Sequence, residues 1–325
     1  GLVRTEVDVV LREVLLQEGD WYSPLLVEKT HKALVNLGFF RSIRMSLENE
    51  TDASDNQVQL ADLKIEAIEG NAGLISFGPG FTLEKGMHYI AEYSYRNFSG
   101  KARRLNLRLG VSQESKQPAI ENSGTPHADV RLGRKFTLGY VEPYIFYSPI
   151  SAQIGFSHNA YSDSLWKETN SFEVALVYPF LRAIFDHSQL SVFYNYKQAE
   201  DSGSRTQKEI LISTGTTQIG QVGIRSSFDG RDDIAWPSKG AFVEAEVSWA
   251  RPWLRGDFSF FRWDLNLNTY RKIVKDWVLA FGTSLSAYEN IEREGATDGN
   301  DVSPSSERFF AGGSDRVRGF RRQLG

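Results

Sequence analysis

From residue 73 onward, apolar and polar residues alternate with a period of two, which is typical of β-strands with two different faces. The run 104–111 shows this most clearly: leucine or valine stands at every odd position, and arginine, asparagine or glycine at every even one. The pattern predicts eleven strands, near residues 73–82, 86–98, 101–112, 130–142, 149–160, 167–179, 188–200, 217–228, 238–250, 257–272 and 276–290.

The predicted strands are long, and this decides between two kinds of β protein. Most reach about ten residues or more, which a tilted strand needs to cross the hydrocarbon core of a membrane. Strands of soluble sandwiches are usually about six residues long. One face of each strand is apolar, the other mixes both charge signs with glycine, and tyrosine and tryptophan gather near the ends. The pattern therefore favours a transmembrane antiparallel β-barrel over a soluble β protein.

Residues 1–70 show a different pattern, mixed α and β. The spacing predicts a helix over Thr5–Leu16 with one apolar face, made of Val7, Val10, Leu11 and Val14. A second helix is predicted after Ser23, an N-cap residue, and before Gly38, a terminating glycine.

Two short alternating segments, near 43–47 and 63–67, complete this region as strands. We therefore expect two domains: a small α+β domain over residues 1–70 and a barrel domain over residues 71–325.

The lengths of the connections suggest an orientation in the membrane. Long polar segments follow the third, seventh and eleventh strands, and tight turns stand near residues 99–100 and 147–149. Outer-membrane barrels have short periplasmic turns and longer extracellular loops. The first strand is therefore predicted to ascend from the periplasm, with the segment after strand eleven at the outer side.

Composition and motifs argue against several classes of function. Basic and acidic residues number 37 and 41, so that no basic field suggests a nucleic-acid partner. The chain has no cysteine, no apolar run long enough for a transmembrane helix, and no nucleophile-elbow, zinc-protease or P-loop motif. Five histidines show no metal-ligand spacing, and the acidic run Asp229–Asp233 is interpreted as a turn rather than a calcium site. We expect neither an enzyme nor a metal or cofactor site.

The most specific motif is the signature run, residues 307–320, which reads Glu-Arg-Phe-Phe-Ala-Gly-Gly-Ser-Asp-Arg-Val-Arg-Gly-Phe. It resembles the Val-Arg-Gly-Phe/Tyr signature of the outer-membrane assembly superfamily of the BamA and TamA type. The resemblance implies a loop that folds back into the barrel and docks an arginine on its inner wall. The residues to which it assigns this role are Gly312, Gly313, Val317, Arg318, Gly319 and Phe320.

The same resemblance extends to the first 70 residues and to the strand count. Two helices and two strands with a Gly38-Phe39-Phe40 corner resemble a POTRA domain, whose opening strand we expect to lie before Gly1. A barrel of this family has about sixteen strands, with the signature between strands eleven and twelve. We therefore expect further strands, and an acidic partner of Arg318, outside this chain. Within it, Glu92, Glu173 and Asp264 are candidates for the inner wall.

The first predicted strand is unusual because it is rich in residues that weaken a β-ladder. Proline donates no hydrogen bond and glycine packs no side chain. One interpretation is an irregular barrel seam, and the other is a seam that opens and templates an incoming strand. The seam residues are Gly73, Ile75, Phe77, Gly78, Pro79 and Gly80.

Together these features imply an outer-membrane factor that inserts client β-barrel or autotransporter proteins. The run Arg308–Gly313 resembles the TamA version more than the BamA version. The expected partners are client proteins, the lipid bilayer and a periplasmic or inner-membrane protein that binds the POTRA domain. A two-partner secretion transporter, a barrel enzyme and a passive porin remain alternatives.

Overall fold

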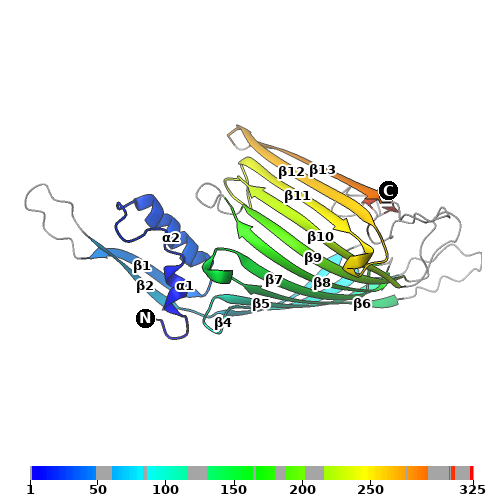
Figure 1. Ribbon diagram of the computed structural model, residues 1–325, viewed down its shortest axis with the longest axis horizontal. Helices are drawn as coiled ribbons and strands as arrows, with labels where there is room; N and C mark the ends of the chain where they lie inside the picture. The colour runs from blue at the N-terminus through cyan, green and yellow to red at the C-terminus, as the bar shows by residue number, and fades with distance from the viewer. Residues whose placement is uncertain are drawn as a thin grey trace, which may run out of the picture.

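The computed structural model describes residues 2–48, 61–82, 86–115, 130–163, 166–180, 188–201, 216–275, 277–291, 307, 309–311 and 323–324. A small α+β domain lies at one end of a large, curved antiparallel sheet (Figure 1). The long strands of the sheet run obliquely away from the small domain (Figure 1).

The small domain has the order helix, helix, strand, strand that the sequence predicts. Its elements are α1 (Val7–Leu11), α2 (Pro24–Asn36), β1 (Phe40–Glu48) and β2 (Asp62–Glu69). Strands β1 and β2 pair antiparallel, with Met45 opposite Ile65. Among the described residues, no helix is both long enough and apolar enough to cross a membrane.

The prediction for the first helix is wrong in its length and in its buried face. Helix α1 has five residues, and its buried side chains are Val9 and Val10. Of the predicted apolar face, Val10 is buried, whereas Val7 and Leu11 are 59% and 60% exposed. The chain leaves the helix early, and beyond it the amide of Leu15 donates to Oγ1 of Thr30 at 3.0 Å. Contact with α2 thus replaces further helical turns.

The second helix begins and ends where the sequence predicts. Ser23 occupies the N-cap position, although its side chain makes no capping hydrogen bond, and Pro24 stands in the first turn. The helix is followed by Gly38, whose φ of +73° is the left-handed conformation that favours glycine. Thr30 and Leu34 form its fully buried side.

The large sheet contains eleven strands in chain order, which confirms the predicted number. Every strand pairs antiparallel with its neighbours, and β3 and β13 form the two edges. The strands are β3 (Gly73–Thr82), β4 (Gly86–Phe98), β5 (Arg103–Ser115), β6 (Val130–Glu142), β7 (Ser151–Asp163), β8 (Trp166–Pro179), β9 (Gln189–Asp201), β10 (Thr216–Asp229), β11 (Lys239–Ala250), β12 (Phe260–Val274) and β13 (Trp277–Asn290).

The register places rows of apolar residues on one face of the sheet, as β5 and its two neighbours show. Leu107 stands opposite Tyr93 on β4 and Leu138 on β6. Arg104 and Asn106 line a cavity on the other face. Because the period along a strand is two, this alternation gives an apolar outer face toward lipid and a polar inner face toward the lumen.

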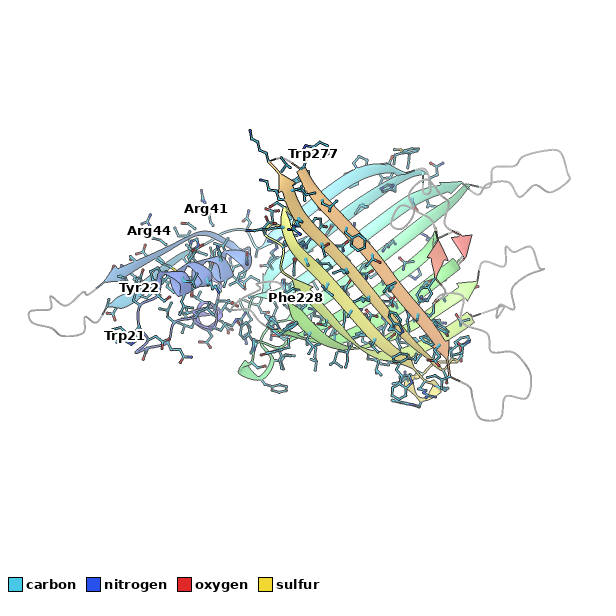
Figure 2. The ribbon with its side chains drawn as sticks, turned by 90° about the horizontal axis from the view of Figure 1, so that it is seen from above. Trp21, Tyr22, Arg41, Arg44, Phe228 and Trp277 are labelled. Carbon is cyan, nitrogen blue, oxygen red and sulfur yellow. The ribbon has the colours of Figure 1, made fainter. Side chains whose placement is uncertain are left out.

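Exposed tryptophans gather at the ends of the strands. Trp236 and Trp253 lie in the connections 230–238 and 251–259, and Trp277 begins β13. Their exposed fractions are 86%, 75% and 78%. Figure 2 shows Trp277 at the end of β13 that lies nearer the small domain. Such positions suit the aromatic belts at the two membrane interfaces.

The acidic run Asp229–Asp233 forms a turn between β10 and β11, as predicted. Asp232 accepts hydrogen bonds from the amides of Ser238 and Lys239 at 2.9 Å and 3.1 Å, and from the Ser238 hydroxyl. These hydrogen bonds hold the pKa of Asp232 well below its ordinary value, and the bond from the Ser238 hydroxyl has the largest effect. The carboxylate thus closes the turn.

One small element has no counterpart in the predictions. Strands β14 (Phe310–Ala311) and β15 (Gln323–Leu324) pair antiparallel, with Phe310 opposite Leu324. They lie near the ends of the large strands farther from the small domain (Figures 1 and 2). The pair brings together the two sides of the segment 312–322.

Glu69 ties the start of the chain to the small domain. Its carboxylate accepts hydrogen bonds from the amides of Arg4, at 3.0 Å and 3.1 Å, and of Thr5, at 2.7 Å. Partial burial alone would raise the pKa of Glu69, but the bonds from Thr5 and Arg4 outweigh it, so that the pKa lies below its ordinary value of 4.5.

We expect cysteine substitutions along β5 to alternate in reactivity. In this cysteine-free chain, Asn106→Cys and Arg108→Cys should react with a water-soluble maleimide in the folded protein. Leu107→Cys and Leu109→Cys should react much more slowly, because they face lipid. Mass spectrometry of labelled protein in liposomes measures this. Reactivity without a period of two would contradict the barrel.

We expect Glu69→Gln to weaken the N-terminal attachment in a pH-dependent way. At pH 7 the loss of the charged acceptor should cost about 1 kcal/mol after allowance for solvent screening, or roughly fivefold faster hydrogen exchange at Arg4 and Thr5. Because the folded pKa is depressed, the stabilisation is present above the ordinary pKa of 4.5 and is lost as the pH falls through the lower folded value. Wild type and variant should therefore converge in acid. Equal exchange at pH 7 would refute the attachment.

Candidate functional site

Strand β3, the predicted seam, lies at an edge of the sheet. It pairs with β4, and the sheet continues from there to β13, away from β3. Ile75 and Phe77 on the outer face are 77% and 71% exposed, so that this edge presents an apolar surface. An edge strand offers unpaired N–H and C=O groups along its free side. The predicted seam residues thus stand where another strand can pair.

The glycines of the seam differ in their surroundings. A side chain at Gly78 would meet open space, whereas a Cβ at Gly80 would collide with the ring of His88 on β4. Pro79 stands between them, opposite Tyr89. Proline in a sheet is confined to edge strands, strand starts or bulges, and its position here agrees with that rule. The second half of β3, which contains Gly78, Pro79 and Gly80, is therefore the weaker half of its ladder with β4.

Ion pairs cover the inner wall near the middle of the sheet. The Nε of Arg225 on β10 donates to Glu246 on β11 at 2.6 Å, and its Nη1 lies 3.8 Å from Glu173 on β8. The guanidinium also stacks over the ring of Phe193, 4.7 Å from its centroid. These contacts confirm that Glu173 faces inward.

A second inner-wall cluster lies on β12 and β13. The Nε and Nη2 of Arg262 donate to the carboxylate of Asp264 at 2.7 Å and 3.3 Å. The hydroxyl of Ser286 donates to the same carboxylate at 2.6 Å. Asp264 therefore also faces inward, as predicted, and it is bound to an arginine of its own strand.

The start of the signature run reaches both β9 and β12. Glu307 is 5% exposed, and its carboxylate accepts hydrogen bonds from Lys197 at 3.1 Å and from Arg262 at 2.8 Å. The ring of Phe309 lies against the guanidinium of Arg262, 5.3 Å from centroid to Cζ. The sequence placed Glu307 at the start of the signature run but assigned it no contact, and it gave no sign of Lys197, which lies on a distant strand.

The motif itself lies outside the described residues. This holds for Gly312 and Gly313 and for the four residues 317–320. The docking of Arg318 on the inner wall therefore stays a prediction.

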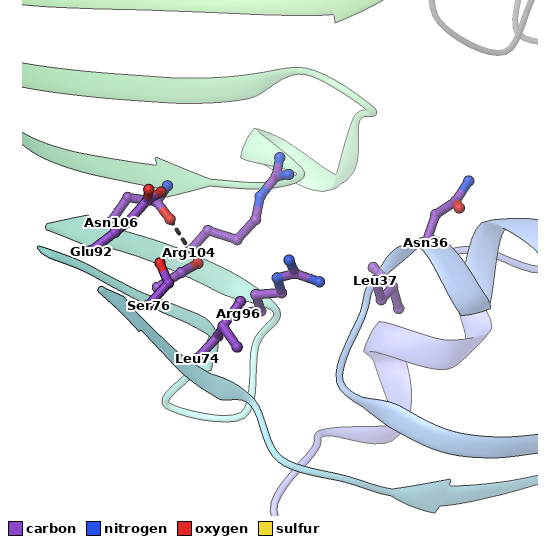
Figure 3. A pocket seen from close by; sticks show the side chains of 9 residues that line it. Asn36, Leu37, Leu74, Ser76, Glu92, Arg96, Arg104 and Asn106 are labelled. Atoms are coloured by element: carbon purple, nitrogen blue, oxygen red, sulfur yellow. Dashed lines mark hydrogen bonds between the residues drawn. The ribbon is translucent and has the colours of Figure 1, made fainter. Parts of the chain in front are cut away.

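A polar cavity of about 480 Å³ lies between the small domain and the inner wall beside the seam. Figure 3 shows Arg96 and Arg104 directed into it from β4 and β5, with Asn36 and Leu37 on the side of the small domain. Glu92 also lines it, which confirms that this residue faces inward. The guanidinium of Arg96 lies so close to Gly38 that a Cβ there would collide with it.

The small domain is bound to the near ends of the strands by a buried junction. The Nδ2 of Asn97, at the end of β4, donates to Oγ1 of Thr5 at 2.9 Å, and its Oδ1 accepts from the amide of Ala102 at 2.9 Å. Phe39, which is 2% exposed, packs in one cluster with Val9 and Ala102. The Gly-Phe-Phe corner, identified from the sequence as a family feature, thus also contacts the barrel.

Arg12 extends this junction to a second turn of the sheet. Its Nη2 donates to the carbonyl of Lys101 at 3.3 Å, and its guanidinium lies 4.5 Å from the ring centroid of Tyr144. Burial lowers the pKa of Arg12, although Glu13 and Tyr144 act in the opposite direction. Two turns, one before β5 and one before β7, thus hold the end of α1.

Comparison with known families places both parts of the chain. A model of the Omp85 superfamily domain matches residues 97–324. The chain belongs to the Omp85 superfamily. A POTRA model, described as a surface antigen variable number repeat, matches residues 1–70. The large sheet is therefore the outer-membrane β-barrel domain, and the small domain is a POTRA domain on the periplasmic side.

Two curated relatives carry the name outer membrane protein assembly factor BamA. The one from Nitratidesulfovibrio vulgaris is 22% identical over 326 residues, which cover 98% of this chain and 36% of the relative. The one from Neorickettsia risticii is 28% identical over 109 residues, 34% of this chain and 14% of the relative. The chain thus spans about a third of the length of the first relative.

Solved structures of the same fold agree with this assignment. BamA from Haemophilus ducreyi lacking POTRA domains 1–3 matches with a TM-score of 0.67 and 18% identity, over 98% of this chain and 58% of that one. CdiB from Acinetobacter baumannii matches with a TM-score of 0.53 and 14% identity, over 98% of this chain and 55% of that one.

We expect Asn97→Ala to loosen the POTRA junction while the barrel stays folded. The substitution leaves the Thr5 hydroxyl and the Ala102 amide without their partner, at a cost of about 2 kcal/mol. Hydrogen exchange over residues 2–12 should become roughly tenfold faster or more. The matched control is Asn266→Ala on β12, which removes the acceptor of a hydrogen bond from Ser284 on β13. It should leave this exchange unchanged. Equal exchange in both variants would contradict the junction.

Proposed function

We propose that this chain is part of an outer-membrane assembly factor that inserts client β-barrel proteins through the edge at β3. The observation that carries the proposal is the combination of an apolar, exposed edge strand with the weakening sequence Gly78-Pro79-Gly80. A client strand that pairs with this edge satisfies its own backbone groups in the membrane, where each unsatisfied group costs several kcal/mol. The names of the two curated relatives support the same class.

The proposal requires no chemical step. Insertion by strand pairing exchanges backbone hydrogen bonds and buries apolar side chains in lipid, so we propose neither a catalytic residue nor a cofactor. The proposal covers both the BamA-like and the TamA-like forms of assembly factor. The named relatives favour the first, and the run Arg308–Gly313 resembles the second.

The POTRA domain is proposed to receive a periplasmic or inner-membrane partner. Trp21 and Tyr22 are 81% and 54% exposed, and Figure 2 shows them on the side of the domain away from the barrel. Large aromatic side chains supply contact area at a low cost in conformational entropy. The partner's surface would thus be apolar where it meets these two residues.

A secretion transporter is the second candidate, because the inner wall is lined by polar and charged residues. Arg225, Glu246 and Asp264 face the lumen, and a passing polypeptide would contact such residues instead of β3. The solved structure of CdiB has the same fold as this chain. The two candidates therefore differ in which residues a client touches.

We expect a client's terminal strand to crosslink to positions 74–81 and not to β9. In the full-length protein, a disulfide that locks β3 to the closing strand should abolish insertion, and reduction should restore it, because the edge must open to pair. A cysteine pair at Ser94 and Asn106, opposite each other on β4 and β5, is the matched control and should leave insertion intact. Crosslinks at inward-facing Arg108 and Asn266 would move the conclusion to the transporter.

A further inference from the structure

The first residue of the signature run, Glu307, lies against the inner wall. Its two partners, Lys197 and Arg262, belong to β9 and β12, and the strands β10 and β11 lie between them. A side chain at the rim of one hairpin contacts neighbouring strands, whereas Glu307 contacts two strands that are not neighbours in the sheet. Glu307 therefore lies over the inner face of the sheet.

The charges of this contact suit a fixed attachment. Glu307 is a carboxylate with 5% exposure, and each of its oxygens faces a cation, Oε1 the Lys197 ammonium and Oε2 the Arg262 guanidinium. A buried charge is stable only when it is paired and hydrogen-bonded. Removal of the carboxylate would leave two cations close together on a wall that excludes water in part.

Arg262 is also held by groups other than Glu307. Asp264 binds its Nε and Nη2, which leaves Nη1 directed to Glu307, and the hydroxyl of Ser286 fixes Asp264 in turn. Phe309 lies against the same guanidinium. A planar guanidinium with an orienting carboxylate loses little freedom on binding a second one. Groups on the wall thus help to orient Arg262 toward Glu307.

The attachment continues to the base of the segment that carries the motif. Phe310 and Ala311 form β14, which pairs with Gln323 and Leu324 of β15. Glu307 stands three residues before this pair, so that the clamp on the wall also fixes the base on both sides of residues 312–322.

We propose that Glu307 is a positioning residue that anchors the signature run to the inner wall through Lys197 and Arg262. This anchor is separate from the predicted contact of Arg318 and has the opposite charge. Its role in client insertion rests on the proposed function, whereas the anchor itself does not. The strands of the wall are held together by backbone pairing, so that loss of Glu307 should release the run and leave the barrel folded.

Trypsin cleavage of the full-length protein in liposomes tests the anchor. The signature run and the residues after it contain Arg316, Arg318, Arg321 and Arg322 as cleavage sites. Cleavage of a transiently released segment follows the population of the released form. We expect Glu307→Gln to raise cleavage at these arginines roughly tenfold, while the barrel keeps its heat-modifiable gel mobility.

The matched control is Glu246→Gln. It removes another carboxylate of the inner wall, bound to Arg225 at 2.6 Å, on a strand other than those that hold Glu307. Its cleavage should equal that of the wild type. Lys197→Met should raise cleavage by less than Glu307→Gln does, because Arg262 still holds the carboxylate, and the double variant should show little further increase over Glu307→Gln, because that change already removes both ion pairs.

The outcomes separate the anchor from the proposed function. Faster cleavage with impaired client assembly supports both, and faster cleavage with normal assembly supports the anchor and counts against the role of this loop in insertion. Cleavage of Glu307→Gln equal to that of the wild type would overturn the anchor, whatever assembly does. If Glu307→Gln does not fold, Lys197→Met decides by the same measurement, and its unchanged cleavage would overturn the anchor.

Discussion

The constraint on which the whole structure depends is that backbone N–H and C=O groups find no partners in hydrocarbon. Eleven strands meet it by pairing in chain order, and each strand between the two edges pairs with the strand before it and the strand after it. The side chains then follow, since a period of two places one apolar row toward lipid and one polar row toward the lumen. Both candidate sites arise where this pairing ends or where the polar row meets another part of the chain.

At the edge of the sheet, the backbone N–H and C=O groups of β3 are the groups that would bind a client strand. Strand β3 combines exposed apolar side chains, Ile75 and Phe77, with a proline and glycines that weaken its ladder. A partner that supplies a strand removes the cost of the open edge, which is why the proposed function needs no catalysis. The POTRA domain is attached close to this edge, through Asn97 at the end of β4.

Inside the barrel, ion pairs between side chains hold parts of the chain together, as backbone hydrogen bonds do in the wall. Arg225 is paired with Glu246, and Arg262 is shared between Asp264 and Glu307. Such pairs in a partly dry lumen are specific because each charge needs its partner. The predicted docking of Arg318 and the proposed anchor at Glu307 would thus hold one loop by charges of both signs.

The sequence by itself determined the number of strands, most of their boundaries and the faces of Leu107 and Arg104, because a period of two is a local property. It also indicated the helix α2, whose end at Gly38 depends on the backbone of one residue. The tertiary structure decided the short α1, which gives way to contact with α2, and the clamp of Glu307, whose partner Lys197 lies 110 residues away. Such contacts depend on how the sheet curves and which strands it brings together, and no local pattern encodes that.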